Sequence, residues 1–317
     1  MSNEISVIGA GVIDVLAGPT DELISTRGSS PMDYVTLAYG GDALNEAVAL
    51  SRLGKRVQWI GKLGDDDAGE KILSYAKSNG LDVGHMTIRR GEQSGVTVVL
   101  VDKFGERRFL TNTNSTLRTQ EESDILPHVD ALAPIVSFAS MFISYRLNVS
   151  AMTRLFKRIK SSGRTLVVDT KQTKHGETLD DVAELLPCMD YFLPNESELA
   201  MLTSGDDVHE NIAALLNRGL PCVVVKVGGK GCIIARKDEL IEIPACPVEK
   251  VIDTTGAGDC FAAGFLFALS EGWSLAECGR FACATASCSV EEVGAVTGVT
   301  NLQKVMRRYR REIAPPF

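Results

Sequence analysis

The chain has 317 residues, of which 44% are apolar and 23% are charged, and its formal net charge is −8. This length can bury a large core, as one domain or as a domain with a small subdomain. The acidic balance argues against a nucleic-acid binder, which usually shows a basic stripe, but it is compatible with binding of phosphorylated metabolites. No apolar run reaches membrane-spanning length, so no membrane association is expected.

The eight cysteines are spread singly, without a C-x-x-C pair and without zinc-binding spacing. This pattern predicts reduced and mostly buried thiols. Residues 1–4 lack the basic region that begins a signal peptide. Together these features predict a cytoplasmic protein.

Residues 5–11 predict a buried strand that ends in a glycine turn. The turn invites a dinucleotide-binding interpretation, which fails two checks. Asp14 stands where the third glycine is required, and Pro19 follows where the phosphate-binding helix should continue. Asp14 therefore leaves the end of a strand either as a turn-capping acid or as a ligand-facing group.

Residues 43–53 predict a helix with one buried face, and Gly54 is the expected C-terminal stop. Gly40 and Gly41 open this helix, and their missing Cβ atoms let a ligand approach the backbone. Asn45 lies in the early, ligand-facing part. A plain amphipathic helix with a glycine start is the alternative interpretation.

Two segments, around residues 12–38 and 95–114, do not follow the strand–helix rhythm of the rest. The first suits a strand pair, and the second is typical of a hairpin with Gly105 in its turn. We expect both segments to form a small β-sheet lid over a site, and we expect a homodimer contact through this lid. Asn114 lies in the polar stretch that closes the second segment and suits hydroxyl ligands.

From residue 135 onward strands alternate with helices, as in a parallel sheet covered on both faces. The pattern predicts strands at 135–138, 165–168, 191–193, 222–227 and 232–235, and helices near 150–160, 180–186, 196–202, 208–218, 275–290 and 301–310. Ligands of such sheets bind at the carboxyl ends of the strands. Asp14, Asp169 and Asn195 fall at such ends, and Lys171 adds a cation.

Residues 253–265 carry the clearest chemical signal in the chain. Gly256 and Gly258 form a turn that feeds an apolar helix, so N–H groups without partners create an anion site suited to phosphate. Asp253 and Asp259 bracket the turn. A carboxylate beside a phosphate site is tolerated if it takes a proton from an attacking hydroxyl. The alternative is an ordinary helix start with a first-turn acid.

Asn195 and Glu198 have the spacing of a capping box, and holding Mg²⁺ near nucleotide phosphates is their alternative role. Residues 223–231 predict a buried strand that runs into a glycine turn. No Gly-x-x-x-x-Gly-Lys-Ser/Thr motif occurs, so the chain is not a P-loop protein.

The stretch 253–265 resembles the second signature of the ribokinase/PfkB family of carbohydrate kinases. The pattern Gly40-Gly41-x-x-x-Asn45 with its downstream Leu-Gly resembles the first, and the likeness to uncharacterised bacterial sugar kinases is the strongest. The resemblance covers the whole chain. It implies a single domain over residues 1–317 with a Rossmann-like α/β ribokinase fold, in which helices flank a mostly parallel central sheet and a small β-sheet forms a lid. It also implies Mg²⁺-dependent transfer of the γ-phosphoryl group of ATP to a sugar hydroxyl.

The resemblance further implies roles for individual residues. Asp259 corresponds to the catalytic base, and Gly256, Ala257 and Gly258 correspond to the anion hole. The other positions are the sugar-contacting Asp14, Gly40, Gly41 and Asn45, the magnesium–phosphate pair Asn195 and Glu198, the nucleotide turn with Lys226, Gly228 and Gly231, and the monovalent-cation (K⁺) region with Asp253, Thr255 and Gly294.

Two positions depart from the family pattern. Cys283 stands where ribokinases commonly place an asparagine against adenine, near the start of the penultimate helix, and Ser140 stands where they carry a sugar-binding glutamate. Lys171, with Asp169 beside it, and Arg107 on the lid suggest an acidic or phosphorylated sugar. They are equally compatible with surface cations on an acidic protein.

Two alternatives to a sugar kinase remain open at this point. A nucleoside kinase of the same fold would stack a base on lid aromatics, for which Phe104 and Phe109 are the candidates. A non-catalytic regulator would bind a sugar or nucleotide without turnover. The intact Gly-Ala-Gly-Asp sequence at residues 256–259 argues against the regulator.

Overall fold

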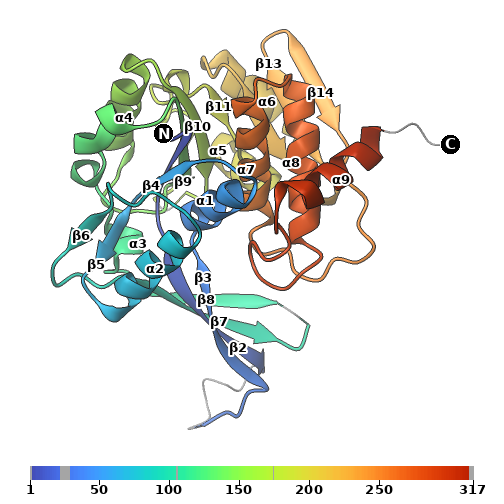
Figure 1. Cartoon of the computed structure of the whole chain (residues 1–317). Coiled ribbons are helices and arrows are strands. Elements are labelled where there is room, and N and C mark those ends of the chain that lie inside the picture. The colour runs from blue at the N-terminus through green and yellow to red at the C-terminus, as the bar shows by residue number, and fades with distance from the viewer. Residues whose placement is uncertain (1, 22–28, 105, 174, 314–317) are drawn as a thin grey trace.

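A central sheet of eight strands organises the fold in a computed structural model of the chain (Figure 1). The structure describes residues 2–21, 29–104, 106–173 and 175–313, so the turn predicted at Gly105 and part of the first lid segment lie outside the described residues. In spatial order the strands are β14 (Glu239–Ile243), β13 (Cys232–Arg236), β12 (Val223–Lys226), β11 (Tyr191–Phe192), β10 (Thr165–Thr170), β9 (Ile135–Met141), β1 (Ile5–Ile8) and β4 (Val57–Ile60). The pairs from β12 to β4 are parallel, and β13 and β14 add an antiparallel edge.

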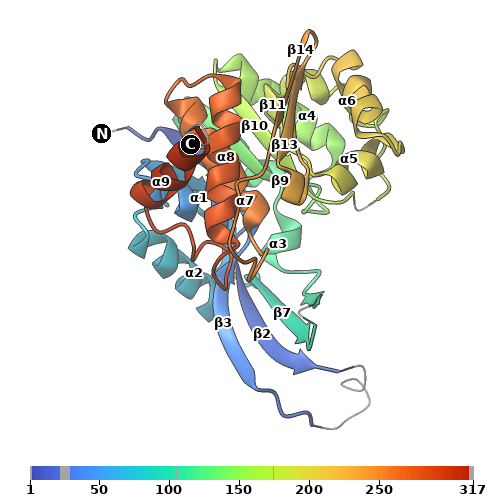
Figure 2. The same cartoon turned by 90° about the vertical axis from the view of Figure 1, so that its right-hand side faces the viewer.

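Helices cover both faces of this sheet (Figure 2). One face carries α1 (Asp42–Arg52), α2 (Asp67–Ser78), α7 (Ala257–Ser270), α8 (Leu275–Ser289) and α9 (Leu302–Ile313), and the other carries α4 (Val149–Ser161), α5 (Glu196–Thr203) and α6 (Val208–Asn217). Two apolar clusters fill the two interfaces, one around Trp59, Phe265 and Phe281, the other around Phe156 and Phe192. Because strands covered on both faces must be apolar throughout, short runs such as those of β1 and β12 identify them in the sequence.

A second sheet of four strands projects from one end of this body (Figures 1 and 2). We call it the lid sheet, and its strands in spatial order are β3 (Tyr34–Gly40), β2 (Val12–Thr20), β7 (Gly95–Asp102) and β8 (Arg107–Thr111). Strands β2 and β7 are parallel, whereas the outer pairs are antiparallel. The expected α/β fold with a mainly parallel sheet and a separate small sheet is confirmed.

The smaller elements connect these parts. They are the strand pair β5 (Lys62–Gly64) and β6 (Thr87–Arg89), the short helix α3 (Thr116–Thr119), and the 3₁₀ turns Glu122–Asp124, Leu126–Ala131, Leu186–Cys188 and Gly228–Lys230. No helix of the described residues is long and apolar enough to cross a membrane.

Two predictions about local structure were wrong. Residues 180–186 form turns that lead into the 3₁₀ turn at Leu186–Cys188 instead of a helix. Pro187 has no N–H to donate and blocks the continuation of an α-helix. Asp14 does not end a central strand, because β1 stops at Ile8 and Asp14 lies inside β2, paired with Ala38 and Thr97.

Candidate active site

The glycine turn before α7 has the geometry of an anion site. Gly256 has φ 70° and precedes the first helical residue, Ala257. A Cβ atom on Gly256 would lie 2.5 Å from the carbonyl oxygen of Ala295, so only glycine fits there. The Ala257 N–H is bonded to the Thr254 carbonyl at 3.2 Å. The N–H groups of Gly258 and Asp259 are the ones that the first helical turn offers to an anion.

Asp259 occupies the first turn of α7 and is only 7% exposed. Its Oδ2 accepts a hydrogen bond of 2.8 Å from Nδ2 of Asn45 on α1. Burial, followed by the nearby charge of Asp42, raises the pKa of Asp259 to about 7. A carboxylate with that pKa is suited to accept a proton near neutral pH.

Asp42 is a site residue that the sequence interpretation missed. Its Oδ2 accepts a bond of 2.7 Å from the Ser140 hydroxyl on β9, and its Oδ1 lies 3.2 Å from Nζ of Lys171. Its charge raises the pKa of both Asp14 and Asp259, which places Asp42 near both carboxyl groups. In the sequence it looks like an ordinary first-turn acid, and its position after the glycine pair was the available signal.

Asp14 reaches the same site from the lid sheet. Burial, followed by the charge of Asp42, raises its pKa to about 6, and Arg107 opposes this shift. A Cβ atom on Gly40 would overlap Oδ2 of Asp14. Gly41 has φ 94°, and a Cβ atom there would lie 2.6 Å from a carbonyl oxygen of the turn after β1. Gly40 therefore leaves room for the Asp14 carboxylate on the neighbouring strand, and Gly41 lets the start of α1 approach the turn between β1 and β2.

Asp169 and Lys226 form an ion pair beside the anion turn. Nζ of Lys226 lies 2.8 and 2.7 Å from the two carboxylate oxygens of Asp169, and both side chains are largely buried. Burial raises the pKa of Asp169, and Lys226 opposes this shift. Nζ of Lys226 would lie 3.6 Å from a Cβ atom on Gly258, so the ammonium group is adjacent to the turn.

The predicted capping box at the start of α5 is confirmed. The Asn195 N–H donates to Oε2 of Glu198 at 2.8 Å, and the Glu198 N–H donates to Oδ1 of Asn195 at 2.9 Å. Burial raises the pKa of Glu198, with Lys226 acting against it. No group of three or more His, Cys, Asp or Glu side chains in the described part of the chain is placed to hold a metal. One carboxylate together with phosphate oxygens is a usual magnesium environment, and Glu198 fits it.

Asp253 fixes the loop on the other side of the anion turn. Its carboxylate accepts N–H bonds of 2.9 Å from both Thr255 and Gly294, and Gly294 has φ 104°. Burial acts to raise the pKa of Asp253, but these N–H groups and Arg107 outweigh it and hold the pKa below its ordinary value. The Arg107 guanidinium donates to Oδ1 of Asp253 at 2.8 Å and to the Thr255 hydroxyl.

Two predicted residues, Cys283 and Asn114, lie elsewhere. Cys283 is in the middle of α8, not near its start, and is 5% exposed with its sulfur 3.9 Å from that of Cys232. Asn114 is exposed, and its N–H donates to Oδ1 of Asn112. Within the described residues, Asn114 makes no hydrogen bond to another predicted site residue. Gly231 has φ 107° and packs against the Ile243 carbonyl, while Gly228 has φ 58° and an open surrounding.

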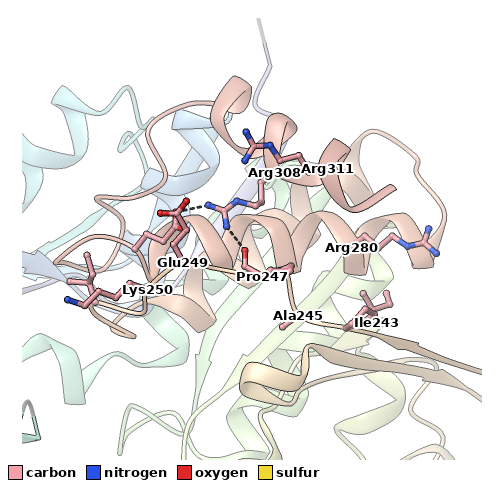
Figure 3. A pocket seen from close by; sticks show the side chains of 11 residues that line it. Ile243, Ala245, Pro247, Glu249, Lys250, Arg280, Arg308 and Arg311 are labelled. Carbon is pink, nitrogen blue, oxygen red and sulfur yellow. Dashed lines mark hydrogen bonds and ion pairs between the residues drawn. The ribbon is translucent and has the colours of Figure 1, made fainter. Parts of the chain in front are cut away.

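A large cavity of about 900 Å³ is shown in Figure 3, and Ile243, Pro244 and Ala245 of its lining are the residues that lie against Gly231. Apolar groups of Pro244, Ala245 and Ile252 form part of its lining, and Ile252 directly precedes Asp253. Arg308 crosses the cavity wall, with bonds of 2.6 Å to Glu291 and 2.7 Å to a backbone carbonyl of the loop after β14. The cavity is separate from the carboxyl groups around Asp259, because none of them lines it.

Glu46 is a second residue that the sequence interpretation missed. It follows Asn45 on α1, is 1% exposed, and its Oε1 has no hydrogen-bond partner within the described residues. Burial raises its pKa well above the ordinary value, and the charges of Asp169 and Asp259 add to this shift. Glu46 is therefore a buried carboxyl group that interacts with the charges of Asp169 and Asp259. A charged residue type gives no signal of burial in the sequence, so the helical pattern could not identify it.

Comparisons with known proteins agree with this geometry. A family model described as pfkB family carbohydrate kinase matches residues 2–302. An "uncharacterized sugar kinase" of Archaeoglobus fulgidus is 33% identical over 256 residues, which cover 80% of this chain and 98% of that protein. A nucleoside kinase of Methanothermobacter thermautotrophicus is 28% identical over 300 residues, which cover 91% of this chain and 90% of that protein. The solved structure of Arabidopsis thaliana ribokinase complexed with ribose and ATP has a TM-score of 0.81 at 25% identity, covering 98% and 99% of the two chains.

The fold and the site thus define a ribokinase-like phosphotransferase. The chain belongs to the pfkB family of carbohydrate kinases. The expected family, fold class and enzyme class are confirmed.

Proposed function

We propose that this enzyme phosphorylates a hydroxyl group of a neutral sugar with ATP and that Asp259 is the catalytic base. The observation that carries the proposal is the position of Asp259, a buried carboxylate with a pKa of about 7 in the first turn of α7, next to the glycine anion turn. A proton acceptor and a phosphate site within one helical turn are the two groups that hydroxyl phosphorylation requires.

The proposed reaction begins with the sugar between the lid sheet and α1. Asp14, Asp42 and Asn45 accept or donate hydrogen bonds to its hydroxyl groups, so that Asp42 provides the carboxylate that Ser140 cannot. Asp259 takes the proton of the attacking sugar hydroxyl while the oxygen of that hydroxyl forms a bond to the γ-phosphorus. The bond from that phosphorus to the bridging oxygen breaks, and ADP leaves with the electron pair. The N–H groups of the anion turn stabilise the charge on the transferred group.

The phosphate contacts follow from charges near the turn. Gly256, Ala257 and Gly258 provide the anion site, and Lys226 adds a cation beside it. Asn195 and Glu198 are placed to hold magnesium with the phosphate oxygens. Magnesium, when bound, neutralises phosphate charge and so lowers the repulsion of an incoming hydroxyl. The nucleoside part of ATP would lie toward the turn with Gly228 and Gly231 and the neighbouring cavity, whose lining combines apolar residues such as Pro244 and Ile252 with charged ones such as Arg280 and Arg308. Cys283 does not line this cavity.

The charges that face the sugar favour a neutral sugar over an acidic one. Lys171 is already paired with Asp42, and Arg107 is bonded to Asp253 and Thr255 at the phosphate end of the site. Three carboxyl groups, Asp14, Asp42 and Asp259, face the same space, so an anionic substrate would meet net repulsion. We rank a nucleoside substrate below a sugar, because Phe104 and Phe109 are 79% and 61% exposed and so do not form a closed stacking surface.

A coupled ADP-release assay over neutral sugars, sugar acids, sugar phosphates and nucleosides tests this proposal. We expect the highest kcat/KM for a neutral sugar, with ATP hydrolysis much slower when no acceptor is present. If only nucleosides are phosphorylated, the enzyme is a nucleoside kinase of the same fold and the proposed sugar substrate is wrong. Ligand binding in a thermal-shift screen without any ADP release would indicate the non-catalytic regulator.

We also propose a monovalent-cation site next to Asp253, formed with Thr255 and Gly294. The N–H bonds that Asp253 accepts from Thr255 and Gly294 and the lowered pKa of Asp253 support it. Activity measured in potassium chloride is expected to exceed activity in choline chloride at equal ionic strength. Equal rates in both salts would contradict a cation requirement.

The outer surface of the lid sheet supports a homodimer. Three exposed apolar side chains, Val35, Leu37 and Leu110, share the face opposite to Asp14 and are 57–68% exposed. Such a patch usually contacts a partner. Light scattering should show a dimer for the wild type and a monomer for Leu37→Glu. A wild-type monomer would contradict the proposal.

The eight buried cysteines, among which the structure has no disulfide, support the cytoplasmic location that we propose.

A further inference from the structure

Arg107 connects the lid sheet to the anion turn. It is the first residue of β8, paired with Val101 of β7, and its side chain is 22% exposed. Its guanidinium donates to Oδ1 of Asp253 at 2.8 Å and to the hydroxyl of Thr255, the residue directly before the glycine turn. Its charge also lowers the pKa of Asp14 on β2. The guanidinium therefore lies between the sugar-facing acid of the lid sheet and the phosphate end of the site.

The donors of this guanidinium exceed the acceptors that hold it. Arginine has five N–H donors, and the bonds to Asp253 and Thr255 engage two of its nitrogen atoms. The two lysines near the site are more fully committed. Lys226 contacts both oxygens of Asp169, and Lys171 is paired with Asp42. Arg107 is thus the cation best placed to give a planar, two-point contact to phosphoryl oxygens.

We propose that Arg107 is a catalytic residue whose guanidinium contacts the transferring phosphoryl group. This inference rests on the proposed kinase function. The bond to the sugar oxygen forms while the bond to the ADP oxygen breaks. During this step the Arg107 guanidinium, on the lid sheet, stabilises the negative charge on the phosphoryl oxygens. Asp253 holds the same guanidinium in place beside the turn. The sheet that carries Asp14 against the sugar then also completes the electrostatics of the reaction.

A purely structural latch is the competing role for Arg107, and a sugar-independent measurement separates the two. Isothermal titration calorimetry gives the affinities of Mg·ATP and Mg·ADP for the wild type, Arg107→Ala, Arg107→Lys and Arg108→Ala. Arg108 is the matched control, because it is the next residue of β8 and is exposed. We expect Arg107→Ala to lose about tenfold of the preference for ATP over ADP and Arg108→Ala to keep it. An unchanged preference in Arg107→Ala would overturn the proposal.

Steady-state kinetics with the best sugar from the ADP-release screen provide the second readout. We expect kcat of Arg107→Ala to fall about 10²- to 10³-fold, as for the loss of one oxyanion donor, with a much smaller change in the KM of the sugar. Free guanidinium at low concentration should partly restore kcat of Arg107→Ala only. If Asp253→Asn gives the same loss and guanidinium restores nothing, Arg107 is a latch and the proposal is wrong.

The two levels of the argument fail in different ways. A wild-type protein that neither binds Mg·ATP nor phosphorylates any acceptor would overturn the proposed function and this inference with it. A wild-type kinase whose Arg107→Ala variant matches Arg108→Ala in both readouts would overturn the role of Arg107 alone.

Discussion

The central sheet and the lid sheet solve different physical problems. In the central sheet all four residues of β1 are buried, and helices cover both faces. In the lid sheet the first four residues of β3 are exposed, including Val35 and Leu37 at 68% and 64%. The body is packed on both faces of its sheet, whereas the lid sheet buries only some of its apolar side chains, such as Val12, Ile13 and Val99, and leaves the start of β3 exposed.

This difference matches the chemistry that each region carries. Asp259 lies in a helix whose inner surface is packed into the core, so its position is fixed to the precision of that packing. Asp14 and Arg107 lie on the lid sheet, and because this sheet is packed less completely, we expect it to be the part that moves when a substrate binds. The proposed proton acceptor would then be held by core packing, while the lid residues depend on fewer contacts.

The largest effect is expected from a substitution of Asp259, which lies in the packed body of the molecule. Asp259→Asn should lower kcat about 10²- to 10⁴-fold, because the amide cannot accept the hydroxyl proton. The coupled ADP assay measures the loss, and circular dichroism melting checks the fold. Asp67→Asn, an exposed first-turn acid of α2, is the matched control and should keep full activity. Full kcat in a folded Asp259→Asn protein would reject the role of Asp259 as base.

The second test compares packing in the two regions. Phe156→Ala removes a fully buried ring beneath the central sheet and should lower the free energy of unfolding by about 3–5 kcal/mol. Phe109→Ala on the lid sheet, at 61% exposure, should change it by less than about 0.5 kcal/mol in dilute solution. Chemical denaturation measures both. A comparable loss in Phe109→Ala would show that the lid surface is buried, as in a dimer.

The third test disturbs the junction between the two regions. Gly40→Ala introduces a Cβ atom where Oδ2 of Asp14 lies, so the carboxylate must move. We expect the KM of the sugar to rise about 10- to 100-fold, since a displaced positioning group weakens substrate alignment. The KM of ATP should change little. If both KM values rise equally, the substitution has deformed the whole site.

The smallest expected effect is a pH dependence set by the rigid acid. Because Asp259 must lose its proton to act as base, kcat/KM should rise about tenfold between pH 6 and pH 8, around its pKa of about 7. Stability should change in the opposite direction. The folded-state pKa lies above the ordinary value of 3.8, so the stabilisation is present at low pH and is lost as pH rises toward 7. A flat rate profile would contradict the assignment.

The central sheet and the anion turn could be predicted from the sequence because their signals are local. Apolar runs, capping residues and the glycines around Gly256 depend on neighbours in the chain. Asp42 and Glu46 could not be assigned, because their roles depend on Ser140, Lys171 and Asp259 from distant segments. The same limit hid the contact of Arg107 with Asp253.

Errors in the prediction had local causes as well. The stretch near residue 180 has helix-forming composition, but Pro187 and its short length favour turns. Cys283 was placed by analogy with an asparagine at the family's adenine site. In the structure, packing of α8 against β13 turns its sulfur toward Cys232 instead. The family pattern fixes a position in the chain, while side-chain packing decides which way the residue faces.

The parallel pairing of β2 with β7 has a consequence for the order of folding. Parallel neighbours cannot be joined by a tight turn, and here α1, β4, β5, α2 and β6 all lie between them in the chain. The ends of that long connection must come together before the two strands pair, which makes this contact slow to form. We therefore expect the pairs β2–β3 and β7–β8, whose strands follow one another in the chain, to form before β2 and β7 join them into one sheet.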